Sequence, residues 1–329
     1  MIDMKQSNAQ TVLWTLCSCR TSTIKDLTQM TGLSFATVGN ILNSFVESGE
    51  VTLGEMHSTT GGRPSQAYTF NAEFAHVLAL SLRVQNENNI ITACVGNLYG
   101  EQVWQTEQLI DKVQLTSFEA MIESSLSLYP RIKILSFSLP GVERNGVIIT
   151  NDYKELEGIL FSDHFQKKYQ LPVLIENDVN AAVSGYGRNK KSMSVIVGIY
   201  FPKDFGPGSG IMIDGKILKG ASGYAGEVNL LPLGIDWVSL NYDDPQEIGT
   251  AITKLISVFG GTINPDQVVL YGDFFTDSIK DAIDQEISSK DIRDIFPPID
   301  YQSDLNTDII TGSITQAVAA YQTGLSVKQ

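Results

Sequence analysis

The sequence predicts a mixed α/β protein whose N-terminal part is a winged helix-turn-helix. Two observations predict this fold class. Within residues 1–71, apolar side chains recur at helical spacing and are followed by two strand-like runs around a glycine-rich loop. From Ala75 onward, apolar runs of strand length alternate with helical stretches, which indicates mixed α/β layers.

Length and composition set the bounds of this prediction. The chain has 329 residues, of which 43% are hydrophobic and 18% charged, as is typical of soluble proteins with two or three domains. No apolar run approaches the roughly 20 residues of a membrane span, and residues 1–6 lack the pattern of a signal peptide. We therefore expect a cytoplasmic protein without a membrane partner.

Charge and cysteine content exclude other classes. The formal net charge of −14 argues against a broad surface that coats nucleic acid, so any DNA contact must be local. Cys17, Cys19 and Cys94 are few and badly spaced for a disulfide framework, and neither cysteine nor histidine follows His164. Free, reduced thiols are expected.

Two apolar stripes at helical spacing predict the first two helices. The stripe within residues 9–19 consists of Val12, Leu13 and Leu16. The next stripe consists of Ile24, Leu27 and Met30. Gly32 can then supply the tight turn that joins the helices of a helix-turn-helix.

The next helix of the motif would be the recognition helix. Ser34 can cap it, and its buried stripe is Val38, Ile41, Leu42 and Phe45. The side chains that it would present to DNA are Ser34, Phe35, Thr37, Asn40 and Ser44. Asn40 is the best candidate for contact with a base edge.

A hairpin is predicted to form the wing. Gly49 ends the recognition helix, residues 51–53 and 66–70 read as strands, and 58–64 is the loop between them. Arg63 in this loop could reach a phosphate or the minor groove of DNA. The alternative, a loop arginine that pairs with a local carboxylate, stays open.

These segments resemble the N-terminal winged helix of the ROK family (repressors, open reading frames and sugar kinases), in its transcriptional-regulator branch. Residues 31–38, 47–49 and 61–65 carry the resemblance, which implies a DNA-binding domain over residues 1–71. Lys and Arg occur four times among these residues and Asp and Glu five times. We therefore expect modest affinity for DNA, supported by helix N-termini, amides and dimerisation more than by counterion release.

The body of the chain alternates between strands and helices. Strands are expected at residues 77–82, 90–95, 101–104, 132–139, 147–150, 173–175, 195–200, 210–213 and 268–270. Helices are expected near residues 117–129, 178–188, 246–260 and 306–324. Residues 72–329 resemble the two-lobed ribonuclease-H-like fold shared by ROK proteins, hexokinases and actin, which implies lobes of approximately 72–180 and 181–329.

A polar cluster lies where an apolar strand gives way to a helix, in residues 174–182. Asn177 and Asp178 could hold vicinal hydroxyls, and Asp178 could accept a proton from one of them. The alternative is that Asp178 only caps the following helix. In ROK sugar kinases an Asp at this position is the general base, and the resemblance therefore implies an inherited sugar site.

Three further positions match the family's sugar contacts. Gly141 lies in a Pro-Gly turn at residues 138–142, and Asn151 matches an Asn beside the substrate. Glu227 ends a glycine-rich loop at residues 219–227, which in the family brings a Glu onto sugar hydroxyls. The expected effector site is therefore Gly141, Asn151, Asn177, Asp178 and Glu227.

The phosphate-binding motifs of the family's kinases are degenerate. Ser81 stands where the Asp of an Asp-x-Gly-Gly-Thr turn is expected, without a following glycine, and Pro207 removes an amide from the second phosphate loop. Gly272 is all that matches a Gly-Gly turn near adenosine. ATP, magnesium and kinase activity are therefore not expected.

The family's zinc site is also missing from the sequence. Leu230 aligns with the expected His, and no cysteines follow, so four tetrahedral ligands cannot be assembled. No metal and no cofactor are expected. Since that His also touches sugar in the family, its replacement puts the identity of the sugar in doubt.

The sequence thus predicts a ROK-type repressor of carbohydrate metabolism that binds operator DNA and a sugar or sugar derivative as effector, without phosphoryl transfer. A homodimer or higher homo-oligomer is expected, because paired half-sites on DNA require one. Two alternatives stay open: a residual ATP-dependent sugar kinase with Asp178 as base, and a ligand-independent DNA-binding dimer.

Overall fold

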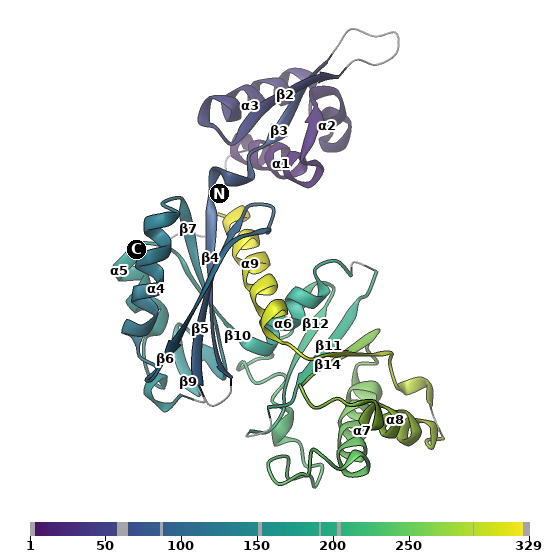
Figure 1. Cartoon of the computed structure of the whole chain (residues 1–329). Coiled ribbons are helices and arrows are strands. Elements are labelled where there is room, and N and C mark those ends of the chain that lie inside the picture. Colours follow the sequence, from purple (N-terminus) through teal and green to yellow (C-terminus); the bar gives the residue numbers. More distant parts are fainter. Residues whose placement is uncertain are drawn as a thin grey trace.

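The computed structural model describes residues 4–57, 65–85, 88–150, 153–190, 192–202, 205–291 and 293–324. Figure 1 shows a small helical module at one end of the molecule, a first lobe directly below it and a second lobe to the side. Helix α9 runs from the boundary between the lobes up to the N-terminal module (Figure 1). Within the described residues, none of the helices is long and apolar enough to cross a bilayer.

The N-terminal module is a winged helix-turn-helix. Its elements are α1 (Met4–Cys19), β1 (Thr21–Thr23), α2 (Ile24–Thr31), α3 (Phe35–Ser48), β2 (Val51–His57) and β3 (Ser65–Phe70), with the strands in the order β1-β3-β2. Ser34 caps α3 through the amide of Thr37, and Gly49 ends it with a φ of 88°. Both ends of the recognition helix were predicted from these residues.

The structure extends the predicted wing and adds a strand. Strand β2 continues to His57, four residues beyond the predicted run, and Thr21–Thr23 forms β1 by pairing with β3. Three polar residues carry no strand pattern of their own, so this strand exists because β3 offers it an edge. The core of the module includes Val12, Leu16, Leu27, Val38, Leu42, Val51, Tyr68, Phe70 and, from the first lobe, Leu98.

The first lobe is built on one mixed sheet in the order β10-β7-β4-β5-β6. Its elements are η1 (Ala72–Phe74), β4 (His76–Gln85), β5 (Asn88–Asn97), β6 (Gln102–Ile110), α4 (Leu115–Leu128), β7 (Ile132–Leu139), β8 (Val142–Arg144), β9 (Val147–Thr150), η2 (Lys154–Leu156), α5 (Phe161–Tyr169) and β10 (Val173–Asn177). Helices α4 and α5 cover one face of the sheet and α9 covers the other.

The second lobe is built on a sheet in the order β13-β12-β11-β14-β15. Its elements are α6 (Asp178–Gly187), β11 (Val195–Tyr200), β12 (Gly208–Ile213), β13 (Lys216–Ile217), η3 (Val228–Leu230), α7 (Pro245–Thr262), β14 (Gln267–Tyr271), α8 (Asp277–Ser288), η4 (Arg293–Ile295), β15 (Ile299–Gln302) and α9 (Asn306–Gln322). Helices α7 and α8 pack on one face of this sheet, and α6 packs on the other.

Helices α6 and α9 cross at two glycines, where the lobes meet. A Cβ at Gly185 would lie 2.0 Å from the carbonyl oxygen of Asp308, and a Cβ at Gly312 would lie 1.8 Å from that of Ala181. Any side chain at either position would force the helices apart, because backbone cannot give way as a flexible side chain does. The two helices are therefore packed backbone against backbone.

Candidate functional site

The polar cluster predicted at the end of a strand lies where β10 passes into α6. Asn177 is the helix cap: its Oδ1 accepts hydrogen bonds from the amides of Val179 (2.9 Å) and Asn180 (3.1 Å). Asp178 is the first residue of α6, and its Oδ1 accepts the Val179 amide at 2.8 Å. The half-buried Asp178 side chain thus lies at the N-terminus of α6, the positive end of the helix dipole.

Asn177 also ties this helix to the first lobe. Its Nδ2 donates to the carbonyl oxygen of Gly141 at 3.1 Å. Gly141 has a φ of 94°, a conformation that glycine adopts without strain, and it turns the chain directly after β7. The structure therefore brings together the predicted residues Gly141, Asn177 and Asp178.

The glycine-rich loop that ends at Glu227 packs against this cluster from the second lobe. Gly226 has a φ of 100°, and a Cβ there would lie 2.0 Å from the carbonyl oxygen of Ser209 in β12. A Cβ at Gly223 would lie 3.3 Å from a methyl of Val142, which follows Gly141. The loop thus contacts both lobes, and Glu227 at its end is half-buried.

Glu176 and Lys219 hold this loop to the start of α6, an arrangement that sequence reasoning missed. The Lys219 ammonium lies 2.9 Å from the buried Glu176 carboxylate. Glu176 Oε1 also accepts the Asn177 amide at 3.0 Å and the Nδ2 of Asn180 at 3.2 Å. Both residues belong to the quoted motifs, but their pairing across 43 positions was not visible in either segment.

Asn180 contributes an acceptor to the same cluster. Its Oδ1 is buried and has no hydrogen-bond partner among the described residues. A buried acceptor without a donor is costly, so a ligand hydroxyl or a water molecule would stabilise it. Carboxylates and amides that converge in this way suit a polyhydroxylated ligand; the fifth predicted residue, Asn151, lies outside the described residues.

The first phosphate turn of a kinase is replaced by regular strand. Ser81 lies within β4, which pairs with β5 without irregularity from His76 to Gln85. Its hydroxyl is buried and donates to Oδ1 of Asn306 at 3.1 Å, in the first turn of α9. The Asp304 carboxylate accepts the Asn306 amide, so a negative charge already occupies the helix end nearest to Ser81.

The positions that match the nucleotide and zinc sites of the family's kinases also make other contacts or are exposed. The Gly272 amide donates to the carbonyl of Gln302 at 3.0 Å. Leu230, at the expected zinc His, is 70% exposed. Across the described ranges, His, Cys, Asp and Glu residues form no cluster of three that could hold a metal ion. Pro207 precedes β12, and residues 203–204 of the same loop lie outside the described residues.

The predicted DNA-contacting residues extend from the cap of α3 at Ser34 to Ser44, beyond the middle of the helix. Ser34, Phe35, Asn40 and Ser44 are exposed, whereas Thr37 is half-buried. The hydroxyl groups of Thr37 and Ser34 are hydrogen-bonded to each other at 2.8 Å, so both also stabilise the helix end. Arg63 lies outside the described residues.

Comparison with known proteins supports the resemblance. Residues 78–233 match the model of the ROK family. A xylose repressor of Caldicellulosiruptor bescii is 27% identical over 236 residues, which are 68% of this chain and 58% of the relative. A xylose repressor of Bacillus subtilis is 25% identical over 61% of this chain and 54% of its own. The chain thus spans less than two thirds of the length of these relatives.

Solved structures confirm the predicted fold. A ROK family transcriptional regulator, described as a homolog of the E. coli MLC protein, superposes with a TM-score of 0.72 at 17% identity over 96% of both chains. A ROK hexokinase from Thermus thermophilus superposes with a TM-score of 0.59 at 15% identity, over 76% of this chain and all of its own. The first comparison therefore covers nearly the whole chain, whereas the second leaves about a quarter of it unmatched.

Proposed function

Because the chain belongs to the ROK family, we propose that it is a transcriptional repressor that responds to a sugar. It binds operator DNA as a homodimer through residues 1–71 and binds its effector between two lobes of residues 72–180 and 181–329. One observation supports this proposal: Asn177 and the turn at Gly141 are held together at the end of β10, whereas β4 is regular strand where the family's kinases have a phosphate turn.

The effector site consists of Gly141, Asn177, Asp178 and Glu227, together with Asn151. Asp178 accepts hydroxyl hydrogen bonds, and Asn177 fixes the turn at Gly141 beside it. D-xylose is the first effector to test, since the curated relatives carry the name xylose repressor. The Asp178 carboxylate binds the ligand but does not act as the general base of a kinase. Phosphoryl transfer depends chiefly on positioned phosphates and metal, and the motifs for these are degenerate.

The DNA side of the proposal rests on the outward-facing residues of α3. Ser34, Phe35, Thr37, Asn40 and Ser44 face the major groove, and Arg63 reaches a phosphate or the minor groove. The protein acts by linkage: the sugar binds one arrangement of the lobes more tightly, and that arrangement has lower affinity for DNA.

Fluorescence anisotropy with the DNA that precedes its own gene tests this proposal. At low salt the protein binds this DNA, D-xylose weakens the binding, and Asn40→Ala weakens it without D-xylose. Asp178→Asn keeps DNA binding and removes the response to D-xylose. Absence of binding at low salt would refute the DNA-binding half, and light scattering that gives a monomer would refute the dimer.

The two alternative hypotheses for the function predict different results. A residual kinase would consume ATP in a coupled assay with hexoses, pentoses or amino sugars, and Asp178→Asn would abolish that turnover. A ligand-independent DNA-binding dimer would show no rise in melting temperature with any member of a sugar panel. Either result would replace the proposed function.

A further inference from the structure

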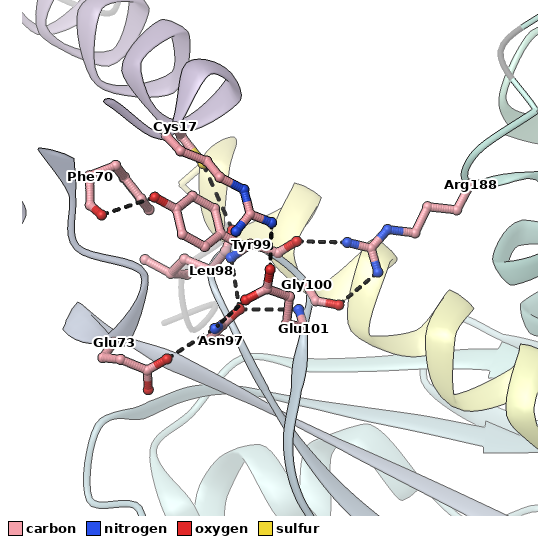
Figure 2. A network of polar contacts seen from close by, with 10 residues as sticks. Cys17, Phe70, Glu73, Asn97, Leu98, Tyr99, Gly100, Glu101 and Arg188 are labelled. Carbon is pink, nitrogen blue, oxygen red and sulfur yellow. Dashed lines mark hydrogen bonds and ion pairs between the residues drawn. The ribbon is translucent and has the colours of Figure 1, made fainter. Parts of the chain in front are cut away.

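The turn between β5 and β6, residues 97–101, lies between the winged helix and the second lobe (Figure 2). It is a rigid turn: Oδ1 of Asn97 accepts the amides of Tyr99 (3.0 Å) and Glu101 (3.1 Å), and the Gly100 amide donates to the Asn97 carbonyl at 2.9 Å. Because these hydrogen bonds within the turn fix its shape, we expect a displacement of one of its residues to shift the whole turn.

One side of this turn holds the winged helix. The Tyr99 hydroxyl donates to the carbonyl of Phe70 at 3.0 Å, and the Cys17 thiol points at the carbonyl of Leu98 at 3.9 Å. Arg20, which follows α1, pairs with Glu101 and lies 4.4 Å from the centre of the Tyr99 ring. These contacts reach both the end of α1 and the end of β3.

The opposite side of the turn is bound by Arg188 of the second lobe. Arg188 follows α6, and its guanidinium donates to the carbonyls of Tyr99 (2.6 Å) and Gly100 (2.7 Å), as Figure 2 shows. A Cβ at Gly100 would lie 2.7 Å from Nη2 of Arg188, so glycine is needed there for the contact as well as for its φ of 72°. These charge-assisted bonds are part-buried, whereas Arg20 and Glu101 are largely exposed.

Helix α6 therefore connects the two functional ends of the molecule. It begins at Asn177 and Asp178, in the candidate effector site, and ends next to Arg188. The glycine crossing with α9 at Gly185 prevents α6 from moving alone. Helix α9 in turn reaches the winged helix, where the Tyr321 ring packs edge-on against Trp14 at 6.2 Å.

We propose that Arg188 couples the effector site to the winged helix, by fixing the turn at residues 97–101 to the end of α6. A shift of α6 at its first residues is passed through Arg188 to the turn, and from the turn to α1 and β3. This inference rests on the proposed function for what binds at the two ends, but the coupling itself is a property of the folded chain.

Cys17 is a native reporter of the contact between the winged helix and the turn at residues 97–101. Burial raises the pKa of its thiol to about 11, and the thiol lies 3.9 Å from the Leu98 carbonyl in the turn, so it should react slowly with N-ethylmaleimide. Cys94 is fully buried in the first lobe and reports global unfolding in the same sample. A Cys19→Ser background removes the remaining thiol, and mass spectrometry separates the two sites.

The experiment compares labelling rates among variants, with no sugar or DNA present. Arg188→Gln should label Cys17 roughly tenfold faster, with Cys94 unchanged, and Arg188→Lys should be intermediate. Arg83→Gln is the matched control, because Arg83 bonds Thr92 and Glu107 in the same β5–β6 hairpin, away from the turn. It should leave the Cys17 rate unchanged.

A double-mutant cycle then tests the connection to the effector site. Asn177→Ala should change the Cys17 rate at least about threefold when Arg188 is present, and less than about 1.5-fold in the Arg188→Gln background. Equal effects of Asn177→Ala in both backgrounds would overturn the proposal. So would an unchanged Cys17 rate in Arg188→Gln, or acceleration of Cys94 together with Cys17 in both Arg188 variants.

This outcome is separable from that of the proposed function. A protein that binds neither DNA nor D-xylose can still show the coupled labelling rates, and a sugar-responsive repressor can show none. The two sets of measurements therefore fail independently.

Discussion

Two regions near the boundary between the lobes are built differently: the end of β10, which is the proposed sugar side, and β4, which is the phosphate side in the family's kinases. On the sugar side, Asn177, Gly141 and the loop at Gly226 are interlocked by hydrogen bonds and close backbone contacts. On the phosphate side, β4 runs through Ser81 as regular strand, and the neighbouring end of α9 is capped by Asp304.

The difference shows how each kind of site is built. Sugar recognition uses side chains at the end of a strand, which a fold can keep in place while its other parts change. Phosphate recognition uses backbone amides in an irregular, glycine-rich turn, and regular strand pairing consumes those amides. Loss of such a turn therefore removes a whole set of donors together.

The largest expected effect tests how firmly the sugar side is assembled. Gly226→Ala should lower the free energy of unfolding by roughly 3 kcal/mol, because the new methyl collides with the Ser209 carbonyl in addition to its backbone strain. Gly215→Ala is the matched control: its φ is 75° but its surroundings are open, so it should cost about 1 kcal/mol. Urea unfolding measures both, and equal losses would show that the loop is loosely packed.

The next prediction addresses the phosphate side. Ser81→Asp restores the missing carboxylate but buries it at a position only 1% exposed, and should cost about 2–3 kcal/mol. It should yield no ATP turnover, since the amides of the strand remain paired. Ser81→Ala, with a cost below about 1 kcal/mol, is the control. Sugar-dependent ATP consumption by Ser81→Asp would contradict the account of this side.

A smaller effect is expected where the loop is tied to α6. Lys219→Met removes the partner of the buried Glu176 carboxylate and should cost about 1 kcal/mol, reduced by the half-exposed position of Lys219. In the Glu176→Gln background the same substitution should cost clearly less. Thermal unfolding of the four proteins measures the coupling, and additive losses would show that the ion pair contributes nothing.

The smallest effect lies outside both regions and calibrates the others. The Arg20 hydrogen bond lowers the pKa of Glu101 from its ordinary value of 4.5. The pair thus stabilises the fold above that value, and its contribution is lost as pH falls through the lowered pKa. Glu101→Gln should lower the melting temperature by about 1 °C at neutral pH, and the difference should disappear once the pH has fallen below the lowered pKa of Glu101. A constant difference would exclude the ion pair as its cause.

Sequence reasoning succeeded where local chemistry determines the structure. Ser34 and Gly49 mark the ends of α3, and the strand end at Asn177 was identified as a polar cluster. It missed α5, whose first residue follows Leu160 without a side-chain cap, although Phe161 and Phe165 are spaced for a helix. It shortened β6, because the half beyond Trp104 is largely polar and exposed, as edge strands often are.

The contacts of the turn at residues 97–101 with the second lobe could not be predicted in the same way. Asn97 and Gly100 indicate a turn, but nothing near them indicates that Arg188 lies against it. Likewise, the ion pair between Glu176 and Lys219 depends on how the two lobes meet. Contacts between distant segments follow from tertiary packing, which periodicity and spacing do not encode.

The close packing of α6 and α9 at Gly185 and Gly312 means that a small tilt of α9 would produce a larger displacement at its end. With a rise of about 1.5 Å per residue, the 17 residues of α9 extend over about 25 Å, and a tilt of about 5° moves one end relative to the other by about 2 Å. Since neither helix can tilt without the other, the small shift of α6 in the proposed coupling would be magnified by α9 at the winged helix. In a symmetric dimer both recognition helices would move, which doubles the change in their separation on DNA.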